Sequence, residues 1–151
     1  MKHRIAVGAL VVQEGRVLLV RHHKPDVYDF WVAPGGGAEG VEDLRTALRR
    51  EVQEETGLLI EPGRIAYIEE LSNPHMRQCK IWFQARLVGG RLSAASHEAA
   101  TEFIAEARFL SRTELRDKLV FPTVLRDTFW GDLAAGFPEA KYLGVREMAF
   151  Y

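Results

Sequence analysis

The sequence contains a single cysteine, Cys79, in 151 residues. An internal disulfide is therefore impossible, and we expect the chain in a reducing, cytoplasmic compartment. No apolar stretch approaches the roughly 18 residues of a membrane-spanning helix, so we expect no membrane partner. Excess charge of either sign is also lacking, since the formal net charge is -1. This balance gives no reason to expect binding to duplex nucleic acid.

The first residues combine a basic start with a short apolar run, a pattern that loosely resembles a secretion signal. The segment MKHRIAVGALVV lacks a small-residue cleavage site, however, and continues through QEGR into a second apolar run, VLLV. Two apolar runs joined by a glycine-containing turn are typical of paired strands. We therefore predict strands over Arg4–Gln13 and Val17–His22, with a turn at Gly15.

Strands outnumber helices in the remainder of the chain. Extended segments are predicted over Tyr28–Pro34 and over residues 64–71, 78–87 and 106–110, and a hairpin-like turn is predicted where VGGR leads into LSA. Helices are predicted over Val41–Thr56 and Val124–Ala135. The pattern predicts one α+β domain over residues 1–151, with helices packed on the faces of a mixed sheet.

The first of these helices ends in a concentration of acid, REVQEETG, which places Glu51, Glu54 and Glu55 after Arg50. At about 100° per residue the helix has an apolar stripe, expected to face the core. Glu55 lies within this stripe and Glu51 lies on its edge. The stripe consists of Val41, Leu44, Leu48 and Val52.

Three acids at a helix C-terminus are electrostatically unfavourable. The helix dipole disfavours each by roughly 0.3–1 kcal/mol, and like charges one turn apart repel further. A surface helix with salt bridges is one explanation, although Arg50 balances only one acid. The other is a divalent cation, because carboxylates at i, i+3 and i+4 can converge on Mg²⁺ or Mn²⁺. Such an ion would be shared with phosphate oxygens of a ligand.

A glycine cluster, PGGGAEG, precedes this helix. Gly35, Gly37 and Gly40 match the G-x-G-x-x-G signature of dinucleotide-binding folds, so an oxidoreductase that binds NAD or flavin is one alternative. The short motif is weak evidence alone. Glu39 in the loop would face the negative pyrophosphate, and strands rather than a βαβ unit follow the helix.

Loop and helix together resemble the Nudix hydrolase family. Residues 36–58, GGAEGVEDLRTALRREVQEETGL, fit the Nudix box G-x5-E-x7-R-E-U-x-E-E-x-G-U, where U is aliphatic. The flanking segments FWVAPGG and EARFLSRTEL are also similar to the family. One departure is Val41, where many members have glycine. The fixed positions are filled by Gly36, Glu42, Arg50, Glu51, Val52, Glu54, Glu55, Gly57 and Leu58.

The resemblance implies an α/β/α sandwich with a mixed sheet, and hydrolysis of a nucleoside diphosphate linked to another group. Glu42 and Arg50 would orient the loop against the helix. Many relatives are dimers, so a homodimer is also implied. The ligands of Mg²⁺ or Mn²⁺ would be the backbone carbonyl of Gly35 and the carboxylates of Glu51, Glu54 and Glu55.

The general base that activates water is open at this level. Glu54 or Glu51 could serve, and so could Glu98 or Glu102 in the later segment HEAATEFIAE. Exposed glutamates are common, so a solvated loop is the alternative for the last two.

Substrate contacts are expected from three further residues. Gly36 and Gly37 belong to the loop, and Arg21 in RHHK carries a guanidinium that matches phosphate geometry. Nucleoside triphosphates, ADP-ribose, dinucleoside polyphosphates and nucleotide sugars all suit the chemistry. Trp31, Trp82 and Phe83 could stack on a base, although aromatic residues in strands usually belong to the core.

A different class of function is a nucleotide-binding sensor that keeps the fold without useful catalysis. The acids argue against it, because a protein that only binds nucleotides need not tolerate their mutual repulsion.

Overall fold

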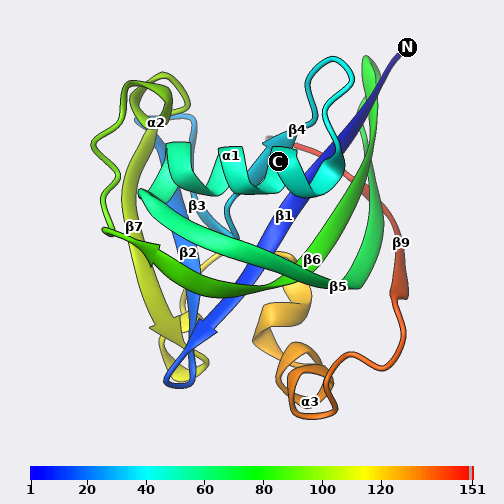
Figure 1. Cartoon of the computed structure of the whole chain (residues 1–151). Coiled ribbons are helices and arrows are strands. Elements are labelled where there is room, and N and C mark those ends of the chain that lie inside the picture. The colour runs from blue at the N-terminus through cyan, green and yellow to red at the C-terminus, as the bar shows by residue number, and fades with distance from the viewer. Residues whose placement is uncertain (150) are drawn as a thin grey trace.

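The computed structural model describes residues 1–149 and 151 of the chain (Figure 1). None of the helices in that part of the chain has the length and apolarity needed to cross a bilayer. The helices are α1 (Leu44–Thr56), α2 (His97–Thr101), α3 (Phe129–Ala134) and the short 3-10 helices η1 (Thr113–Leu115) and η2 (Thr123–Arg126). The strands are β1 (Lys2–Gln13), β2 (Arg16–Lys24), β3 (Tyr28–Val32), β4 (Gly35–Gly37), β5 (Leu58–Ser72), β6 (Met76–Gly90), β7 (Ile104–Ser111), β8 (Val120–Phe121) and β9 (Lys141–Glu147).

All of these strands belong to one mixed sheet of order β8-β3-β2-β1-β6-β5-β9, with β4 paired to β1 and β7 to β2. β1 runs through its centre, antiparallel to β2 and parallel to β6. Glu14 and Gly15 connect β1 to β2 with φ angles of 51° and 73°. Two consecutive positive φ angles suit the right-handed twist of a two-residue hairpin. The predicted strand, turn and strand are confirmed.

Apolar side chains pack on both faces of the sheet. Because neighbouring residues of a strand point to opposite faces, Val7 and Ala9 of β1 share a cluster with Leu48 and Val52 of α1. Leu10 instead shares a cluster with Phe129 of α3 and with other aromatic residues. Figure 1 shows α1 lying across the sheet. The α+β fold with a mixed sheet is confirmed, and Trp31, Trp82 and Phe83 are buried in its core.

The predicted start of the first helix is wrong by three residues. Asp43 is the N-cap, and its side chain accepts a hydrogen bond of 2.6 Å from the backbone N–H of Arg45. Aspartate is a strong N-cap because its oxygen satisfies a free N–H of the first turn. Val41 therefore lies before the helix, fully exposed, and does not belong to the apolar stripe. Glu42 likewise precedes the first turn.

Two further expectations differ from the structure. No strand follows VGGR: the backbone N–H groups of Arg91 and Ser93 donate to Gly57 and Thr56 at the end of α1, over 3.2 and 2.8 Å. Carbonyls at a helix end lack partners within the helix, so the passing chain satisfies them. The final helix is also shorter than predicted, because η2 and α3 replace one continuous helix over Val124–Ala135.

The dinucleotide-binding alternative is contradicted. The glycine cluster forms β4, which pairs antiparallel with β1. The strand after α1, β5, pairs antiparallel with β6, and in the described chain it pairs with neither β3 nor β4. A nucleotide-binding βαβ unit requires parallel strands on both sides of the helix.

Gly8→Ala should destabilise the fold. A Cβ at this position of β1 would lie 2.2 Å from the ring of Trp82, which is fully buried. Overpacking of this kind costs about 1–3 kcal/mol. Gly131→Ala in α3 is the matched control, since a Cβ there meets nothing within 4 Å and alanine favours a helix. Urea denaturation should show a lower midpoint for Gly8→Ala alone; equal midpoints would contradict the packing described.

Candidate active site

The three glycines of β4 allow the loop backbone to approach its neighbours closely. A Cβ on Gly35 would lie 2.0 Å from the carbonyl oxygen of Val7, and one on Gly36 would lie 2.6 Å from the carboxylate of Glu51. A Cβ on Gly37 would lie 2.4 Å from Nε of Arg4. Only glycine lacks the atom that would clash. β4 is thereby seated directly against the acidic end of α1.

Arg50 joins the loop to the helix. Its guanidinium donates to both carboxylate oxygens of Glu42, over 2.6 and 3.2 Å, and to the carbonyl of Gly37 over 3.2 Å. The bidentate contact holds the pKa of the Glu42 carboxyl below its usual range. Arg50 also reaches Glu51 at 3.0 Å and Glu54 at 3.4 Å. The predicted pair of Glu42 and Arg50 is thus present, and it fixes the loop on α1.

Glu51, Glu55 and Glu102 form what we call the acidic cluster, with one oxygen of each within 4.8 Å of the others. Glu51 and Glu55 are 6% and 2% exposed, as the helical wheel indicates for the edge and interior of the apolar stripe. Burial, followed by repulsion from Glu102, raises the pKa of both. The pKa of Glu102 is raised by burial and then by Glu54.

α2 brings Glu102 to this cluster. Ser96, the N-cap of α2, donates from its hydroxyl to the carbonyl of Glu54 and accepts from the N–H of Ala99 at 3.0 Å. One side chain therefore links the end of α1 to the start of α2. Glu102 caps the other end of α2. Glu98, in the first turn, is exposed and lies outside the cluster.

The acidic cluster fits a divalent cation. Oε2 of Glu51 and Oε2 of Glu55 are buried and have no hydrogen-bond partner among the residues that the structure describes. A buried carboxylate oxygen without a partner is costly. Hard cations such as Mg²⁺ and Mn²⁺ take such oxygens as ligands. Glu54 is half-buried and is held by Arg50 rather than within the cluster.

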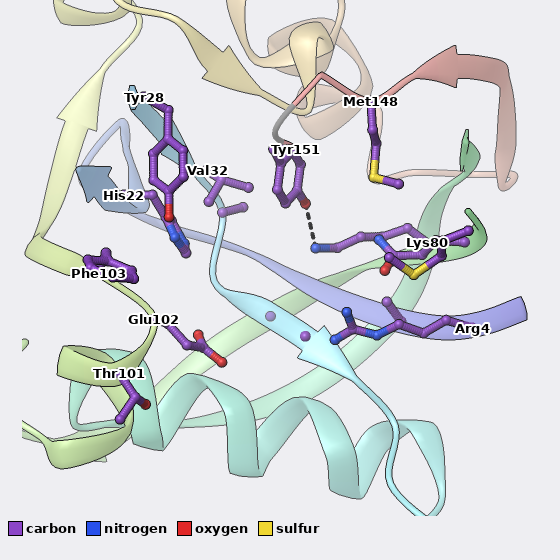
Figure 2. Close-up of a pocket in the computed structure, with 16 residues that line it drawn as sticks. Arg4, His22, Tyr28, Val32, Lys80, Thr101, Glu102, Phe103, Met148 and Tyr151 are labelled. Atoms are coloured by element: carbon purple, nitrogen blue, oxygen red, sulfur yellow. Dashed lines mark hydrogen bonds between the residues drawn. The ribbon is translucent and has the colours of Figure 1, made fainter. Parts of the chain in front are cut away.

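A pocket of about 390 Å³ opens beside the cluster, with Gly35, Gly36 and Glu102 in its wall. Figure 2 shows aromatic side chains on one side, from His22, Tyr28 and Phe103, and basic side chains on the other, from Arg4 and Lys80. Burial lowers the pKa of His22 to about 4, so the aromatic side is uncharged at neutral pH. The remaining wall includes Gln78, Met148 and Tyr151.

Arg21 is not brought to this pocket. Successive residues of β2 face opposite ways, so His22 lines the pocket while Arg21 lines a separate cavity. There its guanidinium donates to both oxygens of Asp29, over 2.7 and 2.8 Å, and to Glu106 at 3.3 Å. The guanidinium is thus occupied within the protein.

Arg4, Gln78 and Lys80 line the pocket, although none of the three is predicted from the sequence as a site residue. Gln78, Lys80 and Trp82 are two residues apart along a strand and therefore share one face of it. Polar residues on the same face as a buried tryptophan are a sequence signal for a polar pocket. Tyr151 gives no such signal, because no predicted element includes it.

Comparison with known proteins agrees with this geometry. The family model of the NUDIX domain matches residues 2–129. The chain belongs to the NUDIX family. Over 122 residues it is 34% identical to the 8-oxo-dGDP phosphatase NUDT18 of Homo sapiens, covering 81% of this chain and 34% of that protein. Over 103 residues it is 39% identical to the RNA pyrophosphohydrolase of Caulobacter vibrioides, covering 58% of this chain and 60% of that protein.

The fold itself is matched by a NUDIX hydrolase from Nitrosomonas europaea, with a TM-score of 0.78 and 21% sequence identity. That likeness covers 98% of this chain and 81% of the other, so it extends to β9 and beyond the segment that the NUDIX model matches. The chain spans less than two thirds of the length of both sequence relatives.

Glu55→Gln should stabilise the metal-free protein. The substitution keeps the shape of the side chain and removes a buried charge next to Glu51 and Glu102, so repulsion and desolvation both fall. We expect the free energy of unfolding in EDTA at pH 8 to rise by roughly 1 kcal/mol, the size of a one-unit change in pKa. Glu61→Gln, at an exposed site, is the control. Equal stability of the two variants would show that Glu55 carries no electrostatic strain.

Proposed function

We propose that this NUDIX protein is a divalent-metal-dependent pyrophosphohydrolase, which cleaves the diphosphate linkage of a nucleoside diphosphate joined to another group. The observation that carries the proposal is the acidic cluster: two of its buried carboxylate oxygens have no hydrogen-bond partner among the described residues, and its third member, Glu102, lines a pocket of about 390 Å³. A cation and the phosphates of a substrate would satisfy both features together.

The metal ligands that the arrangement favours are Glu51, Glu55 and Glu102. Gly35, whose carbonyl the sequence resemblance adds to the ligands, has a backbone hydrogen bond to Glu55. Mg²⁺ or Mn²⁺ held by these residues would supply positive charge that offsets the phosphate oxygens and would make water more acidic at the site. Arg50 orients Glu51 through its 3.0 Å contact, and the Arg50–Glu42 pair keeps the glycine strand in place.

Glu54 is the residue that we assign as general base. It is half-buried next to the cluster, and Arg50 holds it over a long 3.4 Å contact. A carboxylate that coordinates a metal is a poor proton acceptor, whereas one beside the metal can accept a proton from the attacking water. Of the other residues predicted from the sequence as the general base, Glu51 and Glu102 also lie at the acidic cluster.

The names of the relatives support a substrate with a phosphoric anhydride but differ in the rest of the molecule. One is named for 8-oxo-dGDP and another for RNA. A nucleotide is therefore the proposed substrate class. A panel of nucleoside triphosphates (oxidised ones included), ADP-ribose, dinucleoside polyphosphates and nucleotide sugars should show metal-dependent cleavage of the anhydride in at least one member, detected as its two phosphate-containing products. Binding of metal and nucleotides without turnover across the panel would favour the sensor instead.

Glu102→Gln should weaken metal binding, whereas Glu98→Gln should not. Both residues lie at α2, and only Glu102 reaches the acidic cluster. Loss of one charged ligand should raise the dissociation constant for Mn²⁺ at least about tenfold and lower kcat about a hundredfold. Manganese titration followed by electron paramagnetic resonance, with turnover in parallel, would check both. Wild-type manganese affinity in Glu102→Gln would remove this residue from the metal site.

Glu54→Gln should separate catalysis from metal binding. As a general base Glu54 contributes about a hundredfold or more to kcat, and its loss leaves the acidic cluster intact. The expected result is a large fall in kcat with manganese affinity within about twofold of wild type, which is under 0.5 kcal/mol. A variant that keeps full turnover contradicts the assignment of the base. One that loses manganese affinity assigns Glu54 to the metal instead.

A further inference from the structure

One wall of the pocket presents side-chain donors, most of which have no hydrogen-bond partner among the described residues. The parallel pairing of β1 with β6 sets Arg4 beside Gln78 and Ala6 beside Lys80. Because side chains two residues apart on a strand share a face, Arg4, Gln78 and Lys80 all line the pocket. We call these three residues the basic wall.

The side chains of the basic wall have few partners. Within residues 1–149 and 151, the side chains of Arg4 and Gln78 form no hydrogen bond, and Arg4 forms no ion pair. Gln78 is only 6% exposed. An arginine or glutamine side chain carries several donors, so most of this capacity is directed at the pocket.

Lys80 needs a partner most, because it carries a charge and is only 3% exposed. Its ammonium donates to the hydroxyl of Tyr151 over 2.5 Å and lies 4.5 Å from the ring centroid of Trp82. No carboxylate among the described residues lies within 4.0 Å of it. Glu55 and Glu69 attract it from further away, and Glu69 accepts a bond from Trp82. A buried cation of this kind is stabilised by an anion that enters the pocket.

The opposite side of the pocket has a different chemistry. His22 stacks on Phe30 with ring centroids 5.0 Å apart, and Phe103 and Tyr28 extend the aromatic surface (Figure 2). Aromatic faces suit a nucleobase, which stacks on them regardless of its sequence of donors and acceptors. Glu102 projects between the two sides, where the anhydride would lie.

We propose that the basic wall is a subsite for a charged phosphate group of the substrate on the far side of the cleaved anhydride. The nucleobase then occupies the aromatic side. The subsite rests on the proposed function and narrows its substrate class. The enzyme prefers nucleotides that end in an ionised phosphate over conjugates that end in a neutral sugar. Tyr151 acts as a positioning residue that holds the ammonium of Lys80 toward the pocket.

The test measures binding rather than turnover. Calorimetry with Mg²⁺ compares AMP with the α,β-methylene analogue of ATP, whose bridge cannot be hydrolysed, and repeats the pair with the guanosine compounds. Lys80→Met removes the ammonium and keeps the buried stem. We expect it to weaken binding of both triphosphate analogues about tenfold or more, the usual effect of losing a charged hydrogen bond. Binding of AMP and GMP should change less than about threefold.

Three further variants serve as controls. Arg4→Gln should repeat the pattern of Lys80→Met, because its guanidinium belongs to the same wall. Tyr151→Phe keeps both the ring and the ammonium and should change affinity for the analogues by less than about fivefold. Lys118→Met removes a lysine of a separate cavity and should change nothing. Thermal unfolding of Lys80→Met should occur at or above the wild-type temperature, since a buried charge is lost.

Several results would overturn the subsite. If Lys80→Met weakens the binding of AMP and of the ATP analogue equally, the basic wall does not contact the distal phosphate. If Lys80→Met weakens the binding of the adenosine compounds but not of the guanosine compounds, or the reverse, the basic wall contacts the nucleobase. Unchanged affinity in Lys80→Met, or wild-type protein that binds the analogues no more tightly than the monophosphates, removes the proposal. Because no step requires hydrolysis, a lack of turnover would reject the proposed function and leave the subsite standing.

Discussion

Two glutamates buried against a strand of glycines are the constraint around which this molecule is arranged. Glu51 and Glu55 lie on the inward side of α1, and the backbone of β4 approaches them so closely that a single methyl group at Gly36 would collide with Glu51. Buried carboxylates raise the free energy of the folded state unless another group compensates them. Arg50 compensates part of the charge, and two oxygens remain without partners in the described protein.

The surrounding architecture keeps that arrangement rigid. The contact between Arg50 and Glu42 fixes the loop before α1, and Ser96 fixes the segment after β6 on the other end of the helix. Both contacts use groups that a helix end or a loop would otherwise leave unsatisfied. The acidic cluster is therefore assembled from two distant parts of the chain, with little freedom to relax its repulsion.

The pocket is lined by residues from inside and from outside the segment that the NUDIX family model matches. The acidic cluster lies within residues 2–129, which the family model matches, and so do Arg4, Gln78 and Lys80. Met148 and Tyr151 lie outside that segment, yet both line the pocket, and Tyr151 holds the ammonium of Lys80. Residues inside and outside the segment that the family model matches therefore line the same pocket.

The sequence alone determined the features that depend on local periodicity and spacing. The helical wheel predicted the burial of Glu55 and Glu51, because the angle between residues is a property of any α-helix. The box spacing predicted the pair of Glu42 and Arg50. Only the tertiary structure decided the rest. Glu102 rather than Glu54 completes the acidic cluster, and Lys80 rather than Arg21 lines the pocket. These outcomes depend on which strands pair and which way a side chain faces, and contacts between residues far apart in the chain set both.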